Sequence, residues 1–196
     1  MNLPNKLTLS RLVLTVLFLG VMFSRFPYHE TVALVLFILG GLTDLLDGQI
    51  ARRYKLITNF GILMDPLADK ILVCSAFIAF LGVQWVEAWM VVVVVARELA
   101  ITGLRMLAAS KNVVLAAERY GKHKTISQIT AIISLLVNAG YNSWGSVGRA
   151  VFGFEMFGKP WAQLFTTASL YIAIALTIIS GWLYLWKNRA IFIDDL

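Results

Sequence analysis

The sequence predicts an all-α integral membrane protein with six transmembrane helices and with both termini in the cytoplasm. Of its 196 residues, 59% are hydrophobic and 14% are charged, and the mean hydropathy is +0.78. This composition is too apolar for an ordinary soluble domain of this size. Apolar runs of about 20 residues, each long enough to cross a hydrocarbon core of roughly 30 Å, recur along nearly the whole chain.

The expected spans cover residues 7–26, 31–52, 62–82, 88–108, 123–141 and 162–186. The first run should be a retained helix and not a cleaved signal, because Arg11 lies one turn inside it and residues 24–26 offer no small-residue cleavage site. A short interfacial segment is expected over about 2–8, with Thr8 or Ser10 as the helix N-cap. Thr8 and Arg11 are also expected to border the cytoplasmic mouth of the bundle.

The sequence is expected to form a single membrane-embedded domain of residues 1–196. No linker rich in Pro, Gly or Ser divides the chain, and no internal repeat is visible. A third helix that begins near Ile62 keeps Pro66 in its first turn, where the missing N–H has no partner to lose. The longest outer connection, over 142–159, is rich in Gly and Phe, and its pattern defines no particular structure.

The net charge of +6 is concentrated at one set of helix ends. The basic residues at those ends are Lys6, Arg11, Arg52, Arg53, Lys55, Lys111, Arg119, Lys122, Lys124, Lys187 and Arg189. Only Arg25, Arg149 and Lys159 flank the opposite ends, so the positive-inside rule places both termini in the cytoplasm. No soluble basic domain is present to bind nucleic acid, and anionic membrane lipids and phosphorylated substrates are the expected partners.

Four acidic residues fall in otherwise apolar helical segments: Asp44, Asp47, Asp65 and Asp69. A carboxylate at bilayer depth costs several kcal/mol unless it is paired, hydrated or bound to a cation. Spacings of three and four residues place each pair on one helix face. Hard oxygen ligands without His or Cys suit Mg²⁺ or Mn²⁺, and two such ions can clamp a phosphoryl displacement. The alternative is that these aspartates are solvated caps or pair with Arg52 and Lys70.

Small residues accompany the aspartates at matching offsets. Gly48 and Ala51 lie on or beside the Asp44 face, and Gly61 lies one turn before Asp65. Small side chains let a neighbouring helix or a nucleotide approach the backbone closely. Arg52, at the helix end, either contacts a donor phosphate or anchors a lipid headgroup.

The combined pattern is Asp44-x2-Asp47-Gly48-x2-Ala51-Arg52-x8-Gly61-x3-Asp65-x3-Asp69, and through it the chain resembles the CDP-alcohol phosphotransferases. The resemblance implies a six-helix membrane enzyme, usually dimeric, that moves a phosphatidyl group from a CDP-linked lipid to an alcohol and releases CMP. It implies that Asp44, Asp47 and Asp65 bind metal and that Asp69 both contacts metal and acts as the general base. The implied contacts to the CDP donor come from Asp44, Gly48, Ala51, Arg52 and Gly61.

Three further segments, 2–11, 65–70 and 96–105, are similar to the branch of this family that forms phosphatidylglycerophosphate. The implied donor is CDP-diacylglycerol, and the implied acceptor is sn-glycerol 3-phosphate. A homodimer in a bacterial plasma membrane is expected, with its active site facing the cytoplasm. The same chemistry with inositol phosphate, serine or phosphatidylglycerol as acceptor is the alternative. A divalent-cation transporter is a second alternative, although such a protein should place its polar sites near the bilayer midplane.

A phosphorylated acceptor needs cations beyond the metal site. The candidates are Arg105 and Lys122, followed by Arg119, because arginine grips a phosphate with two parallel hydrogen bonds and lysine adds a compact charge. Arg97 lies eight residues before Arg105, so both face roughly the same side and can line one polar cavity. The alternative for Arg97 is an interhelical ion pair that involves its neighbour Glu98.

Other basic residues near the fifth span have simpler explanations. Arg119 and Lys122 also fit as topology-setting charges at the cytoplasmic interface. Lys124 is expected to have that topological role only, and His123 is expected to be a solvated side chain at the interface.

Overall fold

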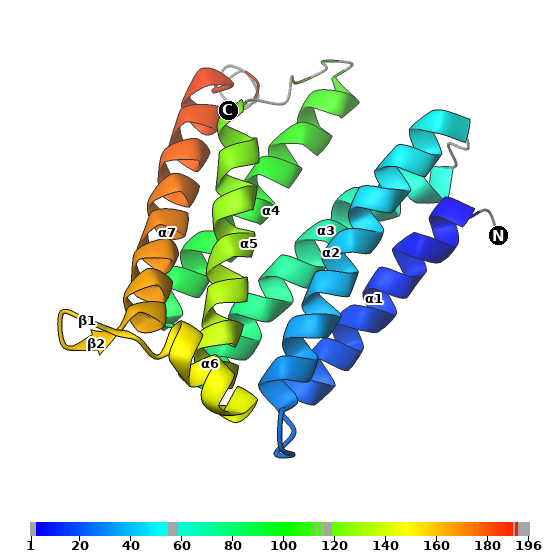
Figure 1. Cartoon of the computed structure of the whole chain (residues 1–196). Coiled ribbons are helices and arrows are strands. Elements are labelled where there is room, and N and C mark those ends of the chain that lie inside the picture. Colours follow the sequence, from blue (N-terminus) through cyan, green and yellow to red (C-terminus); the bar gives the residue numbers. More distant parts are fainter. Residues whose placement is uncertain are drawn as a thin grey trace.

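The computed structural model describes residues 3–54, 59–111, 113, 115, 119–189 and 191. It describes the side chains of all of these residues except 3–5, 7, 44–54, 59–66, 69 and 119–120. Six long helices dominate this part of the chain (Figure 1): α1 (Leu3–Met22), α2 (His29–Tyr54), α3 (Asn59–Gly82), α4 (Ala88–Ser110), α5 (Arg119–Gly140) and α7 (Trp161–Lys187). Each of the six expected spans coincides with one of them. The predicted all-α class is therefore confirmed.

Two expected helix starts were wrong. Because α1 begins at Leu3, Thr8 and Ser10 lie inside the helix and do not cap it. Because α3 begins at Asn59, Pro66 lies beyond the first turn. A proline there removes one helical hydrogen bond, a cost that the helix tolerates without ending.

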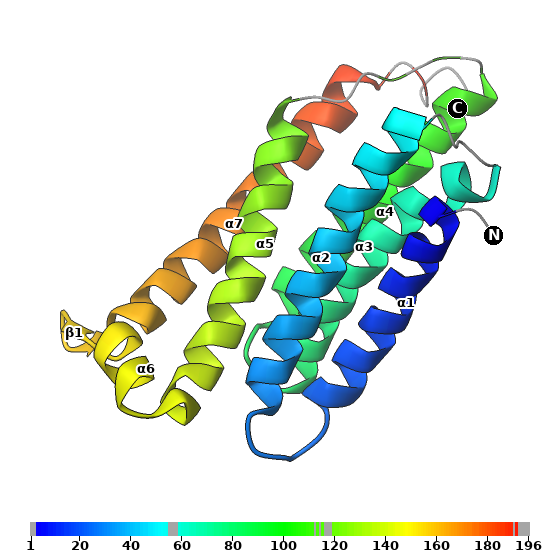
Figure 2. The same cartoon turned by 45° about the vertical axis from the view of Figure 1, so that its right-hand side comes forward.

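The six long helices form a closed bundle in the order α1, α2, α5, α7, α4 and α3, in which each packs against the next and α3 packs against α1. Both chain termini lie at the same end of this bundle, as Figures 1 and 2 show. The last turns of α2, α4 and α7 and the first turns of α3 and α5 lie at that end, called here the terminal end. The interior of the bundle is filled by apolar side chains that are completely buried: Phe18, Phe77, Phe80, Val94, Ile132 and Leu136.

The connection between α5 and α7 folds into short elements at the opposite end. They are a 3₁₀ turn (Tyr141–Trp144), helix α6 (Gly145–Phe152) and a hairpin of β1 (Glu155–Met156) and β2 (Lys159–Pro160). Gly158 has φ +75° in the hairpin turn, a conformation that glycine adopts without strain. The Phe152 ring stacks on Trp161 with centroids 6.0 Å apart, so α6 is held against the start of α7.

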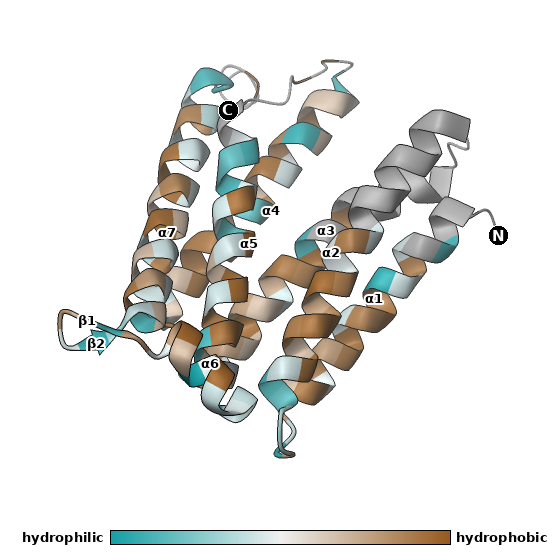
Figure 3. Ribbon diagram, in the orientation of Figure 1, coloured by the Kyte–Doolittle hydropathy of each residue, from teal (hydrophilic) through white to brown (hydrophobic). Residues whose placement is uncertain are grey.

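Large apolar side chains remain exposed along the helices. Examples with more than half of their surface exposed are Val16, Val92, Leu99, Met106, Ile172 and Trp182. Figure 3 shows that apolar residues predominate along much of the described helices. Such a surface would aggregate in water and marks contact with lipid or protein.

Among the described residues, one helix is long and apolar enough to cross a membrane by itself, α7 (Trp161–Lys187). The core helix of a soluble protein meets the same criterion. Apolar helical stretches of 10–17 described residues occur at Thr8–Met22, His29–Thr43 and Lys70–Gly82. The six-span topology and its cytoplasmic orientation therefore stay predictions.

Candidate functional site

The signature residues lie on two helices that contact each other, in the parts of these helices nearest the terminal end of the bundle. Asp44, Asp47, Gly48, Ala51 and Arg52 belong to the last turns of α2, and Gly61, Asp65 and Asp69 belong to the first turns of α3. The expected helical spacing of both aspartate pairs is thus confirmed. The side chains of all eight residues lie outside the described part of the structure, so their roles toward metal and donor stay predictions.

A cavity of about 290 Å³ lies beside residues 37–42 of α2, which precede Asp44 in the helix. Its walls come from α1, α2, α3 and α5, and they are mostly apolar apart from Arg11 and Thr125. Arg11 is 1% exposed, and the Thr15 hydroxyl donates a 2.9 Å hydrogen bond to its carbonyl oxygen. Arg11 was expected at the mouth of the bundle. The structure buries it and places its positive charge at the wall of this cavity.

Among the described side chains, the carboxylate of Glu98 lies between two basic side chains, those of Arg97 and Lys124. An oxygen of Glu98 lies 3.2 Å from Nη1 of Arg97 and also accepts a hydrogen bond from Nζ of Lys124. Glu98 is on α4 and Lys124 is on α5, and both helices pack against α7. The side chains of Glu98 and Lys124 are 7% and 4% exposed. An interhelical ion pair thus exists here, and its cation is Lys124.

The expectation that Lys124 only sets topology was therefore wrong. Lys124, Gln128 and Ile132 are spaced by four residues and form one buried stripe of α5. Gln128 donates a 2.9 Å hydrogen bond to the hydroxyl of Thr177 on α7. The four-residue spacing of these three residues in the sequence already indicated a shared helix face. A count of the charges near a helix end does not show which face of the helix they occupy.

A second polar link joins α3 to α4. The Lys70 ammonium group donates a hydrogen bond to the hydroxyl of Thr102, and that hydroxyl donates to the Glu98 carbonyl oxygen over 2.6 Å. Lys70 directly follows Asp69 in the chain. The polar contacts of Glu98 thus reach the helix that carries two of the four aspartates.

Two of the acceptor-side candidates, Arg97 and Arg105, belong to α4 and contact residues of α7. Nε of Arg105 donates a 3.2 Å hydrogen bond to the hydroxyl of Tyr184, and the guanidinium carbon lies 5.6 Å from the centre of that ring. Arg97 passes Gly181 so closely that a Cβ atom there would lie 3.0 Å from its Cγ atom. Gly181 and Tyr184 are three residues apart, so Arg97 and Arg105 face the same side, as expected.

The remaining candidates lie at the start of α5. Lys122 and His123 are exposed, which confirms the expectation of a solvated His123. Arg119 is the first residue of α5, and its side chain lies outside the described part of the structure. The structure therefore brings Arg97 and Arg105 to one wall, and it leaves Lys122 at the surface of another helix.

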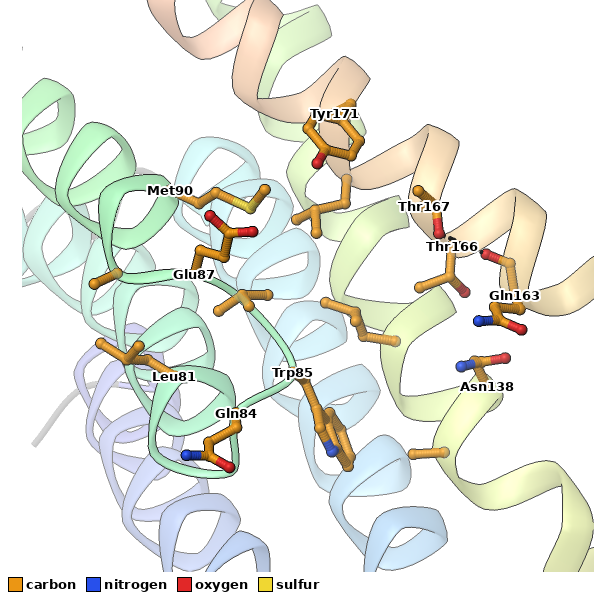
Figure 4. A pocket seen from close by; sticks show the side chains of 15 residues that line it. Leu81, Gln84, Trp85, Glu87, Met90, Asn138, Gln163, Thr166, Thr167 and Tyr171 are labelled. Carbon is orange, nitrogen blue, oxygen red and sulfur yellow. Dashed lines mark hydrogen bonds between the residues drawn. The ribbon is translucent and has the colours of Figure 1, made fainter.

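A cavity of about 790 Å³ is at the other end of the bundle. Figure 4 shows its polar side chains, which include Gln84, Glu87, Asn138, Gln163 and Tyr171, between the α3–α4 connection and the facing parts of α5 and α7. Within the described residues, no group of three or more His, Cys, Asp or Glu side chains could hold a metal ion. The side chains of the expected metal ligands on α2 and α3 lie outside that part of the structure.

Comparison with known proteins adds a match over most of the chain. The family model described as CDP-alcohol phosphatidyltransferase matches residues 1–179. A protein of Bacillus subtilis is 38% identical over 95% of both chains, and one of Cereibacter sphaeroides is 33% identical over 99% of this chain and 98% of its own. A protein of Mycoplasma pneumoniae is 30% identical over 93% of this chain and 86% of its own. All three are named CDP-diacylglycerol–glycerol-3-phosphate 3-phosphatidyltransferase.

The burial of Lys124 predicts that it contributes far more to stability than its neighbour Lys122. Lys124→Ala should lower the free energy of unfolding by about 3 kcal/mol, because it removes one partner of a buried carboxylate. Lys122→Ala should change it by less than about 0.5 kcal/mol, because that side chain is exposed. Denaturant titration of both variants in the same micelles measures the difference. Equal effects would contradict the buried ion pair.

Proposed function

This chain belongs to the CDP-alcohol phosphatidyltransferase family, and we propose that it transfers a phosphatidyl group from CDP-diacylglycerol to sn-glycerol 3-phosphate, giving phosphatidylglycerophosphate and CMP. The observation that carries the proposal is the similarity over nearly the full length to relatives named for this reaction. The eight signature residues, located on two contacting helices, support the same chemistry.

The donor set fits hard divalent cations. Asp44, Asp47, Asp65 and Asp69 supply only carboxylate oxygens, and they come from the terminal ends of two contacting helices. Such ligands favour Mg²⁺ or Mn²⁺ over softer metals, and four of them suit a pair of ions. When bound, these ions supply positive charge that neutralises the donor diphosphate and makes CMP a better leaving group.

The residues around this set have separate roles in the proposed reaction. Gly48, Ala51 and Gly61 leave room for the nucleotide to approach the helix backbones, and Arg52 contacts the donor phosphate. Asp69 accepts the proton of the acceptor hydroxyl as that oxygen attacks the phosphorus atom next to the lipid. The proton moves to the carboxylate while the bond to CMP breaks.

The cations of α4 and α5 form the acceptor side. Arg105, held by Tyr184, keeps its terminal guanidinium nitrogens for the phosphate of glycerol 3-phosphate, and Lys122 and Arg119 add charge from the start of α5. Arg97 contributes to the same electropositive region from deeper in α4. A phosphate-bearing acceptor fits these cations better than serine does.

The exposed apolar surface supports a membrane location for all six long helices. Large apolar side chains that face outward along the helices are stable in lipid and unfavourable in water. Under the positive-inside rule, the terminal end with its basic residues faces the cytoplasm, where glycerol 3-phosphate is dissolved. A bacterial plasma membrane and a homodimer complete the proposal.

Substrate specificity provides the direct test. Purified protein with CDP-diacylglycerol and Mg²⁺ should release CMP when sn-glycerol 3-phosphate is added, and a chelator should stop that release. Chromatographic detection of CMP, with serine and inositol phosphate as parallel acceptors, measures it. Release with serine alone, or undiminished release after chelation, would contradict the proposal.

Replacement of the proposed base should abolish turnover without unfolding the protein. Asp69→Asn keeps the size of the side chain but removes a proton acceptor and a ligand charge, so kcat should fall by about 10²-fold or more. The matched control is Glu155→Gln, a similar change in the exposed hairpin at the far end. Near-normal CMP release by Asp69→Asn would exclude it as the base.

Loss of Arg105 should affect the acceptor more than the donor. Arg105→Ala removes a binding contact to the acceptor phosphate, so the KM for glycerol 3-phosphate should rise by about tenfold while the KM for CDP-diacylglycerol changes little. Arg149→Ala, which removes an exposed arginine of α6, is the control. Steady-state kinetics with each substrate varied in turn measures both constants. Equal increases in the two constants would argue against an acceptor contact.

A further inference from the structure

We propose that Glu98 is a positioning residue for the acceptor side of the site, acting through Arg97 and Lys124. This inference rests on the proposed transfer to glycerol 3-phosphate. Glu98 is itself an anion and would repel a phosphate, so it is not an acceptor ligand. Its role is to fix the cations of two helices relative to each other and to the helix that carries Asp69.

The contacts of Glu98 span three helices. Its carboxylate takes one partner from its own helix, Arg97, and one from α5, Lys124. Its carbonyl oxygen accepts the hydrogen bond of Thr102, which in turn accepts one from Lys70 on α3. The Glu98 side chain thus joins α4 to α5, and its carbonyl oxygen is bonded by the Thr102 hydroxyl that links α4 to Lys70 on α3, the residue after Asp69.

Stability alone explains this arrangement poorly. Replacing a buried ion pair by well-packed apolar side chains is often neutral or stabilising, so such a pair adds little that an apolar contact would not. What the charged pair adds is a defined geometry, because each hydrogen bond has a required distance and direction. Two cations without the carboxylate between them would repel each other and separate.

The position of the Glu98–Lys124 ion pair indicates which distance it fixes, that between the basic residues of α4 and those of α5. Lys124 lies two residues after Lys122, so its anchoring sets the rotation of the first turns of α5. Arg97 lies on the side of α4 that also presents Arg105 to α7. Holding Arg97 and Lys124 on one carboxylate therefore sets the spacing between the basic residues of α4 and those of α5, which is the spacing an acceptor phosphate must match.

The test compares Glu98→Gln and Glu98→Asp with Glu87→Gln, a matched change at the other end of the bundle, in the full-length protein. Glu98→Gln should raise the KM for glycerol 3-phosphate by about tenfold, within the range found for residues of polar networks, and leave the KM for CDP-diacylglycerol within about twofold. Glu98→Asp keeps the charge and should give an intermediate KM for the acceptor. Glu87→Gln should match the wild type.

Calorimetric titration of glycerol 3-phosphate in the presence of Mg²⁺ and CDP gives a second measurement that needs no turnover. Its dissociation constant should follow the same order among the variants. If the wild type is active but Glu98→Gln and Glu98→Asp keep its acceptor KM, or raise both KM values equally, the inference is wrong and the proposed function stands. If Glu98→Gln does not fold, the acceptor KM of Glu98→Asp decides. A wild type that neither binds glycerol 3-phosphate nor releases CMP overturns the proposed function, and this inference falls with it.

Discussion

A charge that is surrounded by apolar helices must be paired, hydrated or bound to an ion, because an isolated buried charge costs several kcal/mol. In this bundle the rule is visible at Glu98, which has a cation on each side, and at Lys124, which is buried against it. It explains why these side chains occur in contact and not scattered through the interior. Apolar packing can hold six helices together in many rotations, whereas one buried acid with two partners permits few.

The signature acids and the proposed acceptor bases lie on different helices of the bundle. The four signature aspartates belong to α2 and α3, whereas the basic residues proposed for the acceptor belong to α4 and α5 and lie in part against α7. Acids and bases on separate helices of one bundle suit the proposed reaction, which joins a metal-bound diphosphate to a second phosphorylated molecule. In the proposed reaction the acids hold the cations that screen the donor, and the bases attract the acceptor, which the acids would repel.

The sequence predicted what depends on local spacing. Apolar runs located all six long helices, and spacings of three and four residues placed the aspartate pairs at helical positions. The connection over 142–159 could not be predicted, because its fold depends on aromatic contacts such as Phe152 with Trp161. The pairing of Glu98 with Lys124 was also missed, because it depends on α4 and α5 packing against the same helix. Spacing within one helix indicates a buried face, but not the partner that the face meets.

This difference explains why the sequence predicts the proposed metal and donor residues more firmly than the proposed acceptor residues. The metal and donor residues lie on two helices that are consecutive in sequence, so one continuous pattern captures them. The acceptor side combines α4, α5 and α7, which contact one another only in the folded bundle. If the proposed acceptor contacts are right, substitutions at positions such as Arg105 or Tyr184 can change the acceptor and leave the signature intact. A family built this way can keep one transfer chemistry while its acceptors diverge, and the residues that hold the acceptor cations in place are then as important for specificity as the cations themselves.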